Sequence, residues 1–331
     1  MTRTADRMRH VWRSLLVAAL SVLLILPAAA AGAGDSVSIV DFDPAQAQFP
    51  EGIASSKTGT LYVSWTLRDE LVAIDPDGNT EVVTHLPAGS APAGMVVTPD
   101  NVIYVAAGGI DLATGITDPE TRGVYKVEPG QTPERIAGTE AMTFPNDVTM
   151  DQTGNIYVTD TVAGTVWRIP KHGVPELWAA DPLLEGTGDL GFGFPIGANG
   201  IAVDHKKVIV ANPEKGLLVS LPIETDGSAG AATLLAGSPL LAGADGIALD
   251  VHGNIHVVAG LQNSVVVVRD DGSIDTLATA AEGLNQPATL AFGSGRRDTQ
   301  TLFVTIFSIF APEPTPGVLA FPAGNPGLPV P

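Results

Sequence analysis

One pattern recurs six times along the chain, and this repeat limits the possible folds more than any other feature. Each copy has a short opening, a turn, and a strand that ends in Val and a small residue. The aligned residue of each opening lies at position 51, 93, 146, 199, 245 or 288, so successive copies are 42 to 53 residues apart. Periods of this length with several short strands are typical of β-propeller blades.

The two ends of the repeat region indicate how the ring closes. Pro322–Pro331 is too rich in Pro and Gly to supply a fourth strand to the sixth copy. Ser36–Phe42 alternates like a strand and precedes the first opening. We therefore predict an all-β fold, a six-bladed β-propeller with four-stranded blades, in which this N-terminal strand closes the last blade and removes a sheet edge.

The first 34 residues do not fit the repeat and look like a signal peptide. Four Arg residues precede the apolar run Ser14–Leu26, and small residues follow it. The alternative, an uncleaved anchor, needs a longer apolar run. We predict that residues 1–34 are a signal peptide and short leader. Residues 35–331 then form a single propeller domain with a Pro-rich tail, in a secreted or extracytoplasmic protein with no membrane attachment after cleavage.

The charge balance limits the partners. The chain has 17 basic and 36 acidic residues, and loss of residues 1–34 leaves 13 and 35, a net charge of −22. Such a surface repels nucleic acid and anionic membranes, so we expect a small-molecule substrate. The absence of Cys excludes disulfides, thiolate metal sites and Cys nucleophiles.

The aligned residues of the six openings point to a metal site. Equivalent positions in the blades of a propeller surround the central axis, and these begin the innermost strand, so they should face the channel mouth. The six are Glu51, Ala93, Asn146, Asn199, Asp245 and Ala288. Four of them carry oxygen ligands that suit a hard divalent cation, with Ca²⁺ preferred and Mg²⁺, Mn²⁺ or Zn²⁺ as alternatives. Ordinary turn chemistry would explain an Asn or Asp before Gly, but not Glu51 or the shared position.

The motifs around these residues resemble those of the SMP-30/gluconolactonase/LRE-like family of six-bladed propellers, and also NHL-type propellers. The resemblance covers about Gln48 to Thr305 and rests on Pro50-Glu51-Gly52, Pro145-Asn146-Asp147, Asn199-Gly200, Asp245-Gly246, Leu290-Ala291-Phe292-Gly293 and Leu302-Phe303-Val304-Thr305. It implies that Glu51, Asn199 and Asp245 bind the metal. It also implies that Asn146 lies beside the ion and helps to hold water or substrate.

One position departs from the family pattern. Members that act on sugar acids often carry an Arg two residues before that Asn, where this chain has Phe144. Three long segments, 107–122, 181–196 and 306–316, should reach the same face and wall a pocket, unless they are only surface insertions. Their apolar residues are Leu112, Ile116, Leu183, Leu184, Phe192, Phe194, Phe307 and Phe310. We expect a partly apolar pocket that favours a less polar lactone.

The leading functional hypothesis is a metal-dependent hydrolase acting on a lactone or related cyclic ester. The ion would polarise the carbonyl oxygen and hold a water molecule. Asp245 is our first choice for the general base and Asp147 the second, although Asp147 could instead brace the loop around Asn146. Asn146 would orient the substrate or stabilise the oxyanion.

Two other functions remain compatible with the sequence. The protein could be a non-catalytic binding propeller with a structural ion, because a fold does not determine a function. It could also be a lyase or condensing enzyme, since related propellers host such chemistry. That function needs a His or Glu base near the pocket, and no His occupies a channel position.

Overall fold

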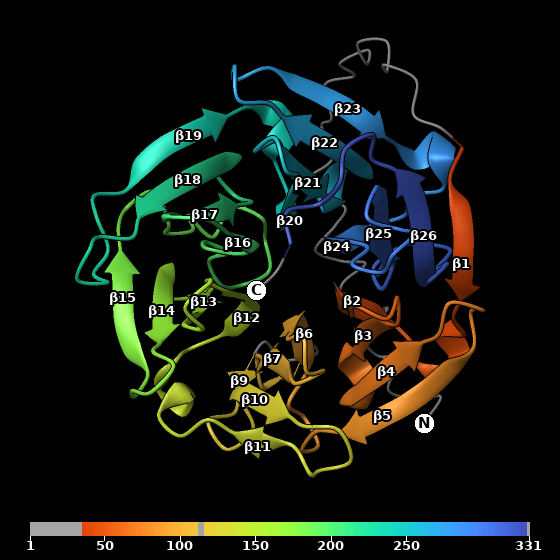
Figure 1. Ribbon diagram of the computed structural model, residues 1–331, viewed down its shortest axis with the longest axis horizontal. Coiled ribbons are helices and arrows are strands. Elements are labelled where there is room, and N and C mark those ends of the chain that lie inside the picture. The colour runs from red at the N-terminus through yellow and green to blue at the C-terminus, as the bar shows by residue number, and fades with distance from the viewer. Residues whose placement is uncertain (1–34, 112–115, 330–331) are drawn as a thin grey trace.

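Six antiparallel sheets of four strands each surround a central axis in the computed structural model, which describes residues 35–111 and 116–329. Figure 1 views the ring along this axis. The predicted six-bladed, all-β propeller is therefore confirmed. The predicted signal peptide, residues 1–34, lies outside the described residues. Within the described part of the chain, no helix is long and apolar enough to cross a bilayer.

The blades follow one another along the chain, and within each blade the strands are named from the axis outward. Blades 1 to 3 are β2 (Pro50–Ser55), β3 (Leu61–Trp65), β4 (Glu70–Ile74), β5 (Thr80–His85); β6 (Pro92–Val97), β7 (Ile103–Ala107), β10 (Gly123–Val127), β11 (Glu134–Arg135); and β12 (Pro145–Met150), β13 (Ile156–Asp160), β14 (Thr165–Ile169), β15 (Glu176–Ala180). Blades 4 to 6 are β16 (Ile201–Asp204), β17 (Lys207–Asn212), β18 (Leu217–Pro222), β19 (Thr233–Gly237); β20 (Ala244–Leu249), β21 (Ile255–Ala259), β22 (Ser264–Val268), β23 (Ile274–Ala278); and β24 (Pro287–Phe292), β25 (Thr301–Ile306), β26 (Gly317–Pro322), β1 (Val37–Asp41).

The remaining described elements are short and lie in the connections between strands. They are the two-stranded hairpin of β8 (Ile110–Asp111) and β9 (Ile116–Thr117), and the 3-10 turns η1 (Pro44–Gln46), η2 (Thr66–Arg68), η3 (Thr139–Ala141), η4 (Pro239–Leu241), η5 (Gly260–Gln262) and η6 (Ala280–Glu282).

The N-terminal strand closes the ring, as the sequence predicts. In blade 6, β1 pairs antiparallel with β26, with Val37 opposite Ala320 and Asp41 opposite Gly317. The sixth sheet is thus completed by a segment from the other end of the chain, which covers the outer edge of β26.

The core lies between neighbouring blades. Val63 of blade 1 packs in one cluster with Phe303 of blade 6, and Leu71 of blade 1 packs in another with Met95 of blade 2. Each sheet therefore buries apolar side chains on both faces, which explains the runs of apolar residues in middle strands such as β17 and β22. This packing fixes the position of each innermost strand around the axis.

The innermost strands share an irregularity at the point where the candidate ligands lie. In β2, β6, β12, β20 and β24 the pairing register shifts directly after the first residue, for example between Pro50 and Ile53. A bulge of this kind leaves a residue outside the ladder and re-aims its side chain. In blade 4 the strand itself begins at Ile201, and the backbone N–H of Asn199 donates to the carbonyl of Ala211 over 2.9 Å.

Candidate metal centre

The bulges of blades 1, 3 and 5, together with the segment before β16 in blade 4, place the four predicted ligands at one end of the channel. Glu51, Asn146 and Asn199 are all buried and line the same pocket. Asp245 is half-buried, and its charge acts on Glu51. The aligned Ala93 lines this pocket too, and Ala288 is buried. The structure therefore brings together the four oxygen-bearing positions that the sequence singled out.

Three carboxyl groups of this cluster have raised pKa values. Burial, followed by the charges of Asp245 and Asp147, raises the pKa of Glu51 well above its ordinary value. Burial raises the pKa of Asp245 to about 8, and the charge of Asp147 adds to this. Burial also raises the pKa of Asp147 to about 7, although hydrogen bonds from two backbone N–H groups oppose it. Such a cluster is stable when protons or a cation offset its charge.

Two oxygens in the cluster have no hydrogen-bond donor among the described residues. They are Oε2 of Glu51 and Oδ1 of Asn199, and both are buried. An unsatisfied buried acceptor costs about 1–3 kcal/mol, so a native structure needs a reason to keep two in one place. A hard cation that accepts oxygen ligands would supply that reason.

The candidate metal ligands comprise both carboxylate and amide oxygens. Within the part of the chain that the structure describes, no three His, Cys, Asp or Glu side chains are grouped so that they could hold an ion alone. An ion at this position would also need the amide oxygens of Asn146 and Asn199. Carboxylate and amide oxygens with no nitrogen or sulfur fit Ca²⁺ or Mg²⁺ better than Zn²⁺. The ligand set of Glu51, Asn146, Asn199 and Asp245 stays a prediction.

Asp147 lies next to the cluster but both of its oxygens are engaged. Oδ1 accepts from the backbone N–H of Val148 over 2.8 Å, and Oδ2 accepts from that of Ile201 in blade 4 over 3.0 Å. The carboxylate thus joins the inner strands of blades 3 and 4. Gly94 leaves room for it, because a Cβ there would lie 2.0 Å from Oδ1 of Asp147. These contacts favour the bracing role over the general-base role.

Buried hydroxyl groups hold the backbone around Glu51, and the sequence reasoning missed them. Oγ1 of Thr305 in blade 6 donates to the carbonyl of Glu51 over 2.8 Å. Oγ of Ser64 in blade 1 accepts from the N–H of Gly52 and donates to the carbonyl of Ala93 in blade 2. The sequence feature that could have revealed these hydroxyl groups is the small residue that follows Val in each second strand. These hydroxyl groups tie three consecutive blades together beneath the candidate site.

The pocket above the ligands holds about 150 Å³ and is mostly apolar. Its described lining residues are Glu51, Thr66, Ala91, Ala93, Ile110, Phe144, Asn146, Thr161, Phe192, Phe194, Ile196, Asn199, Phe307 and Phe310. The segments 181–196 and 306–316 therefore wall the pocket, and Ile110 comes from the third predicted segment. Leu112 lies outside the described residues. Leu184 is instead fully buried with Tyr157 in the core between blades 3 and 4.

A comparison with protein-family models gives a match over residues 49–308, to the SMP-30/gluconolactonase/LRE-like region. This range spans all six openings and most of the chain. The chain belongs to the SMP-30/gluconolactonase/LRE-like family. The family assignment predicted from the ligand motifs is thus confirmed, and it supports a lactonase-type or calcium-binding function at the level of the family.

Solved structures with the fold of this family resemble the chain along most of its length. A gluconolactonase from Xanthomonas campestris has a TM-score of 0.64 and 18% identity, covering 88% of this chain and 90% of its own. A luciferin-regenerating enzyme has a TM-score of 0.66 and 14% identity, covering 90% and 98%. The calcium-binding protein regucalcin from Agrobacterium tumefaciens has a TM-score of 0.61 and 17% identity, covering 89% and 95%. These identities establish the shared fold alone. A search of curated proteins gave no match.

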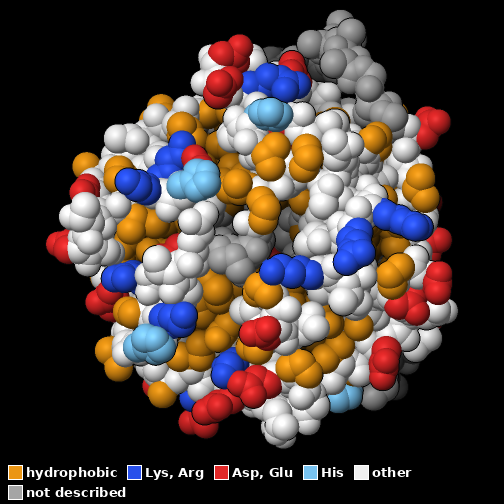
Figure 2. All heavy atoms as spheres, viewed as in Figure 1, with side chains coloured by type: hydrophobic (Ala, Val, Ile, Leu, Met, Phe, Trp, Pro, Cys, Tyr) orange, Lys and Arg blue, Asp and Glu red, His pale blue; other side chains and the backbone are white. Residues whose placement is uncertain are grey.

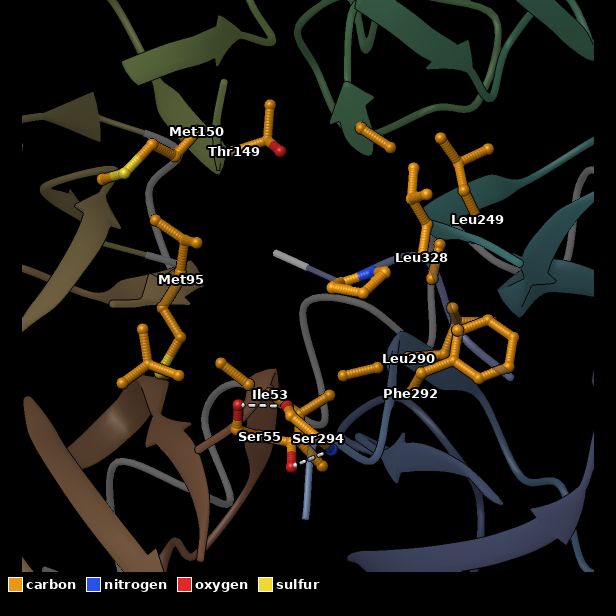
Figure 3. Close-up of a pocket in the computed structure, with 18 of the residues that line it drawn as sticks. Ile53, Ser55, Met95, Thr149, Met150, Leu249, Leu290, Phe292, Ser294 and Leu328 are labelled. Carbon is orange, nitrogen blue, oxygen red and sulfur yellow. Dashed lines mark hydrogen bonds between the residues drawn. The ribbon is translucent and has the colours of Figure 1, made fainter. Parts of the chain in front are cut away.

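In this family member the other end of the channel is lined by apolar side chains together with hydroxyl groups and Lys57, and the C-terminal segment covers it. A cavity of about 250 Å³ lies there, and Figure 3 shows Met95, Leu249 and Phe292 around it. The C-terminal segment crosses this end of the channel, where the backbone N–H of Leu328 donates a hydrogen bond to the carbonyl of Leu249 over 2.8 Å. Figure 1 shows the described chain after β26 running toward the centre of the ring, and Figure 2 shows hydrophobic side chains around the same central region.

Proposed function

We propose that this protein is a metal-dependent hydrolase that opens a lactone or a related cyclic ester. The observation that carries the proposal is the pair of buried, donor-free oxygens of Glu51 and Asn199 among three carboxyl groups, at the base of a pocket. Family membership supports the reaction class, and the gluconolactonase and regucalcin among its structural neighbours support lactone chemistry and a calcium ion.

The residues present fit a divalent cation, and Glu51, Asn199, Asp245 and Asn146 would hold it. When bound, such an ion supplies a Lewis acid that polarises an ester carbonyl. The apolar walls around Phe144 exclude bulk water from the reacting groups, which strengthens every electrostatic interaction among them.

The chain's own side chains then move the protons. The carboxylate of Asp245 accepts a proton from the water that attacks the carbonyl carbon. The side-chain N–H of Asn146 donates to the carbonyl oxygen as it gains negative charge. The bond from the carbonyl carbon to the ring oxygen breaks, and that oxygen receives the proton from Asp245. The product is the open-chain hydroxy acid.

Substitution of Asp245 tests the proposal. Asp245→Asn keeps an oxygen ligand but removes the base, so kcat should fall at least ~10²-fold at saturating metal. Asn146→Ala leaves all the carboxylates in place and should also lower kcat, by ~10²-fold, since it removes an oxyanion donor. Rates should be measured on a panel of aliphatic, aromatic and sugar lactones, with metal occupancy determined for each variant.

The outcomes separate an enzyme from a binding propeller. Wild-type rates in both variants, with the fold and the ion retained, would show that this site does not carry the reaction. A wild-type protein that binds an ion without hydrolysing any lactone in the panel would be a binding module with a structural ion.

A further inference from the structure

Six phenylalanine rings form a continuous chain of contacts around the pocket mouth, and we call this chain the phenylalanine belt. The distances between ring centroids are 6.3 Å for Phe144 and Phe194, 6.4 Å for Phe194 and Phe192, 6.0 Å for Phe192 and Phe310, 6.4 Å for Phe310 and Phe307, and 6.4 Å for Phe307 and Phe49. The chain has ten Phe in all. Six of them thus belong to one chain of contacts, and five of these six line the same pocket.

The belt is assembled from separate parts of the ring and is held in place. Phe144 and Phe49 directly precede the inner strands β12 and β2, whereas the other four lie in the β15–β16 and β25–β26 connections. The backbone N–H of Phe310 donates to Oε1 of Gln286 over 2.9 Å. The ring of Phe144 lies against the backbone at Gly108, where a Cβ would come within 2.2 Å of it. These contacts indicate a built wall rather than a loose surface loop.

The rings are placed to meet a ligand. Phe49 is buried, but the five others are half-buried and line the pocket. Exposed aromatic surface at the mouth of a pocket loses water only when an apolar group covers it, and that burial favours binding by ~25 cal/mol per Å². Aromatic groups gain further from tilted or edge contacts with such rings.

The pocket has few free hydrogen-bonding groups for a polar substrate. Apart from the candidate ion ligands, its described polar side chains are those of Thr66 and Thr161. Both hydroxyl groups already donate to backbone carbonyls, Thr66 to Pro92 over 2.8 Å and Thr161 to Ala198 over 2.7 Å. No Lys, Arg or His occurs among the described residues that line the pocket. Away from the candidate ion ligands, buried hydroxyls or a carboxylate on the substrate would therefore lose their water without finding a donor.

We propose that the phenylalanine belt makes this site selective for a neutral lactone that carries an aryl or alkyl group, and selective against polyhydroxylated and anionic lactones. The inference rests on the proposed lactone hydrolysis. A volume of ~150 Å³ is enough for a benzene ring, and thus for the aryl part of a substrate. An aryl-fused six-membered lactone such as dihydrocoumarin combines this aryl part with the ester that the proposed reaction opens.

The test compares dihydrocoumarin with glucono-1,5-lactone in the wild type and three variants. We expect the wild type to prefer dihydrocoumarin by ~10²-fold in kcat/KM. Phe194→Ala and Phe310→Ala should each lose at least ~10-fold on dihydrocoumarin and less on the sugar lactone. Leu261→Ala is the matched control: Leu261 is 59% exposed in η5, on the same face but outside the pocket, and its variant should keep wild-type values.

A binding measurement separates this inference from the proposed reaction. The lactam analogue of dihydrocoumarin, 3,4-dihydro-2-quinolinone, resists hydrolysis, and its affinity can be measured by calorimetry with metal present. Suppose that no lactone is hydrolysed but this lactam binds the wild type at least ~10-fold more tightly than the belt variants. The proposed hydrolysis is then wrong, and the selectivity of the phenylalanine belt for an apolar ligand is supported. A preference for the sugar lactone, or belt variants with wild-type values for both compounds, would overturn the inference. Phe194→Leu replaces Phe194→Ala if that variant does not fold.

Discussion

The two ends of the central channel are built from the same inner strands but differ in their hydrogen bonding. Along β2, Glu51 lies at the end with the candidate ligands, here called the upper end, and Ile53 lies at the other, lower end; along β20, Asp245 lies at the upper end and Leu249 at the lower end. Among the described residues that line the two pockets, buried oxygens without donors occur only at the upper end, whereas the lower end is lined by apolar side chains together with hydroxyl groups and Lys57 and is crossed by the hydrogen-bonded C-terminal segment. The difference supports the proposal that the unpaired oxygens of the upper end bind a ligand.

The largest expected effect comes from removing one charge at the upper end. Glu51→Gln keeps an oxygen but loses a negative charge, so the affinity for Ca²⁺ should fall ~10²-fold, or ~2.7 kcal/mol. In the metal-free state the same change removes a buried carboxyl, so the variant should melt no lower than the wild type. Calorimetric titration measures the Ca²⁺ affinity, and thermal melts with chelator measure the stability of the metal-free state.

Met95→Leu at the lower end is the control and should leave the Ca²⁺ affinity unchanged. Equal affinities in wild type and Glu51→Gln would remove Glu51 from the site.

A smaller effect should appear in the pH dependence of the metal-free protein. The folded-state pKa values of Asp245 and Asp147, about 8 and about 7, lie above those of an unfolded chain, near 4. Between pH 4 and 8 the unfolded state therefore releases protons that the folded state keeps, and stability falls as pH rises. We expect the chelated protein to melt about 5 °C higher at pH 5 than at pH 8.

The ion and a charge-removing variant check the origin of this pH effect. Saturating Ca²⁺ should abolish it, since the ion takes the place of the protons. Asp245→Asn should reduce it in the chelated protein. A chelated protein that melts at the same temperature at both pH values would contradict the raised pKa values of the cluster.

The smallest effect should follow from opening the lower end. Deletion of residues 323–331 removes backbone hydrogen bonds from Gly327 to Thr299 and from Leu328 to Leu249, among others. Each contributes about 1 kcal/mol, and much of this is offset by the entropy of ordering the segment. The melting temperature should fall by about 2–4 °C, while the Ca²⁺ affinity stays within about twofold. A large loss of affinity would show that the two ends are coupled.

The fold and the common location of the candidate ligands could be predicted because both follow from the repeat. Glu51, Asn146, Asn199 and Asp245 share one position of six aligned openings, and the ring converts a shared position into proximity. The closing strand was predictable because Pro322–Pro331 lacks the pattern of a strand.

The features that were not predictable depend on contacts without a repeat. The Thr305 hydroxyl reaches Glu51 from 254 residues away. The small residue after Val marks the position of Thr305 in its strand, but it does not reveal which backbone carbonyl in the neighbouring blade the hydroxyl contacts. The C-terminal segment covers the channel through bonds to turns of blades 5 and 6 that are unique in the chain. The apolar content of segments 181–196 and 306–316 predicted that Phe192 and Phe310 would line the pocket. The contact between the two rings depends on how these two loops meet, which the sequence does not show.

The pairing of β1 with β26 also has a consequence for the growing chain. Val37 finds its partner Ala320 only after about 280 further residues have been made. At ~5–20 residues per second, that delay is roughly 15 to 60 s. Throughout it, Val37–Asp41 is an unpaired strand bearing apolar residues, open to pairing with other chains, and five blades can assemble before it is covered. The unpaired first strand is therefore an aggregation site in the growing chain, and a chaperone that occupies this segment would protect it until the ring can close.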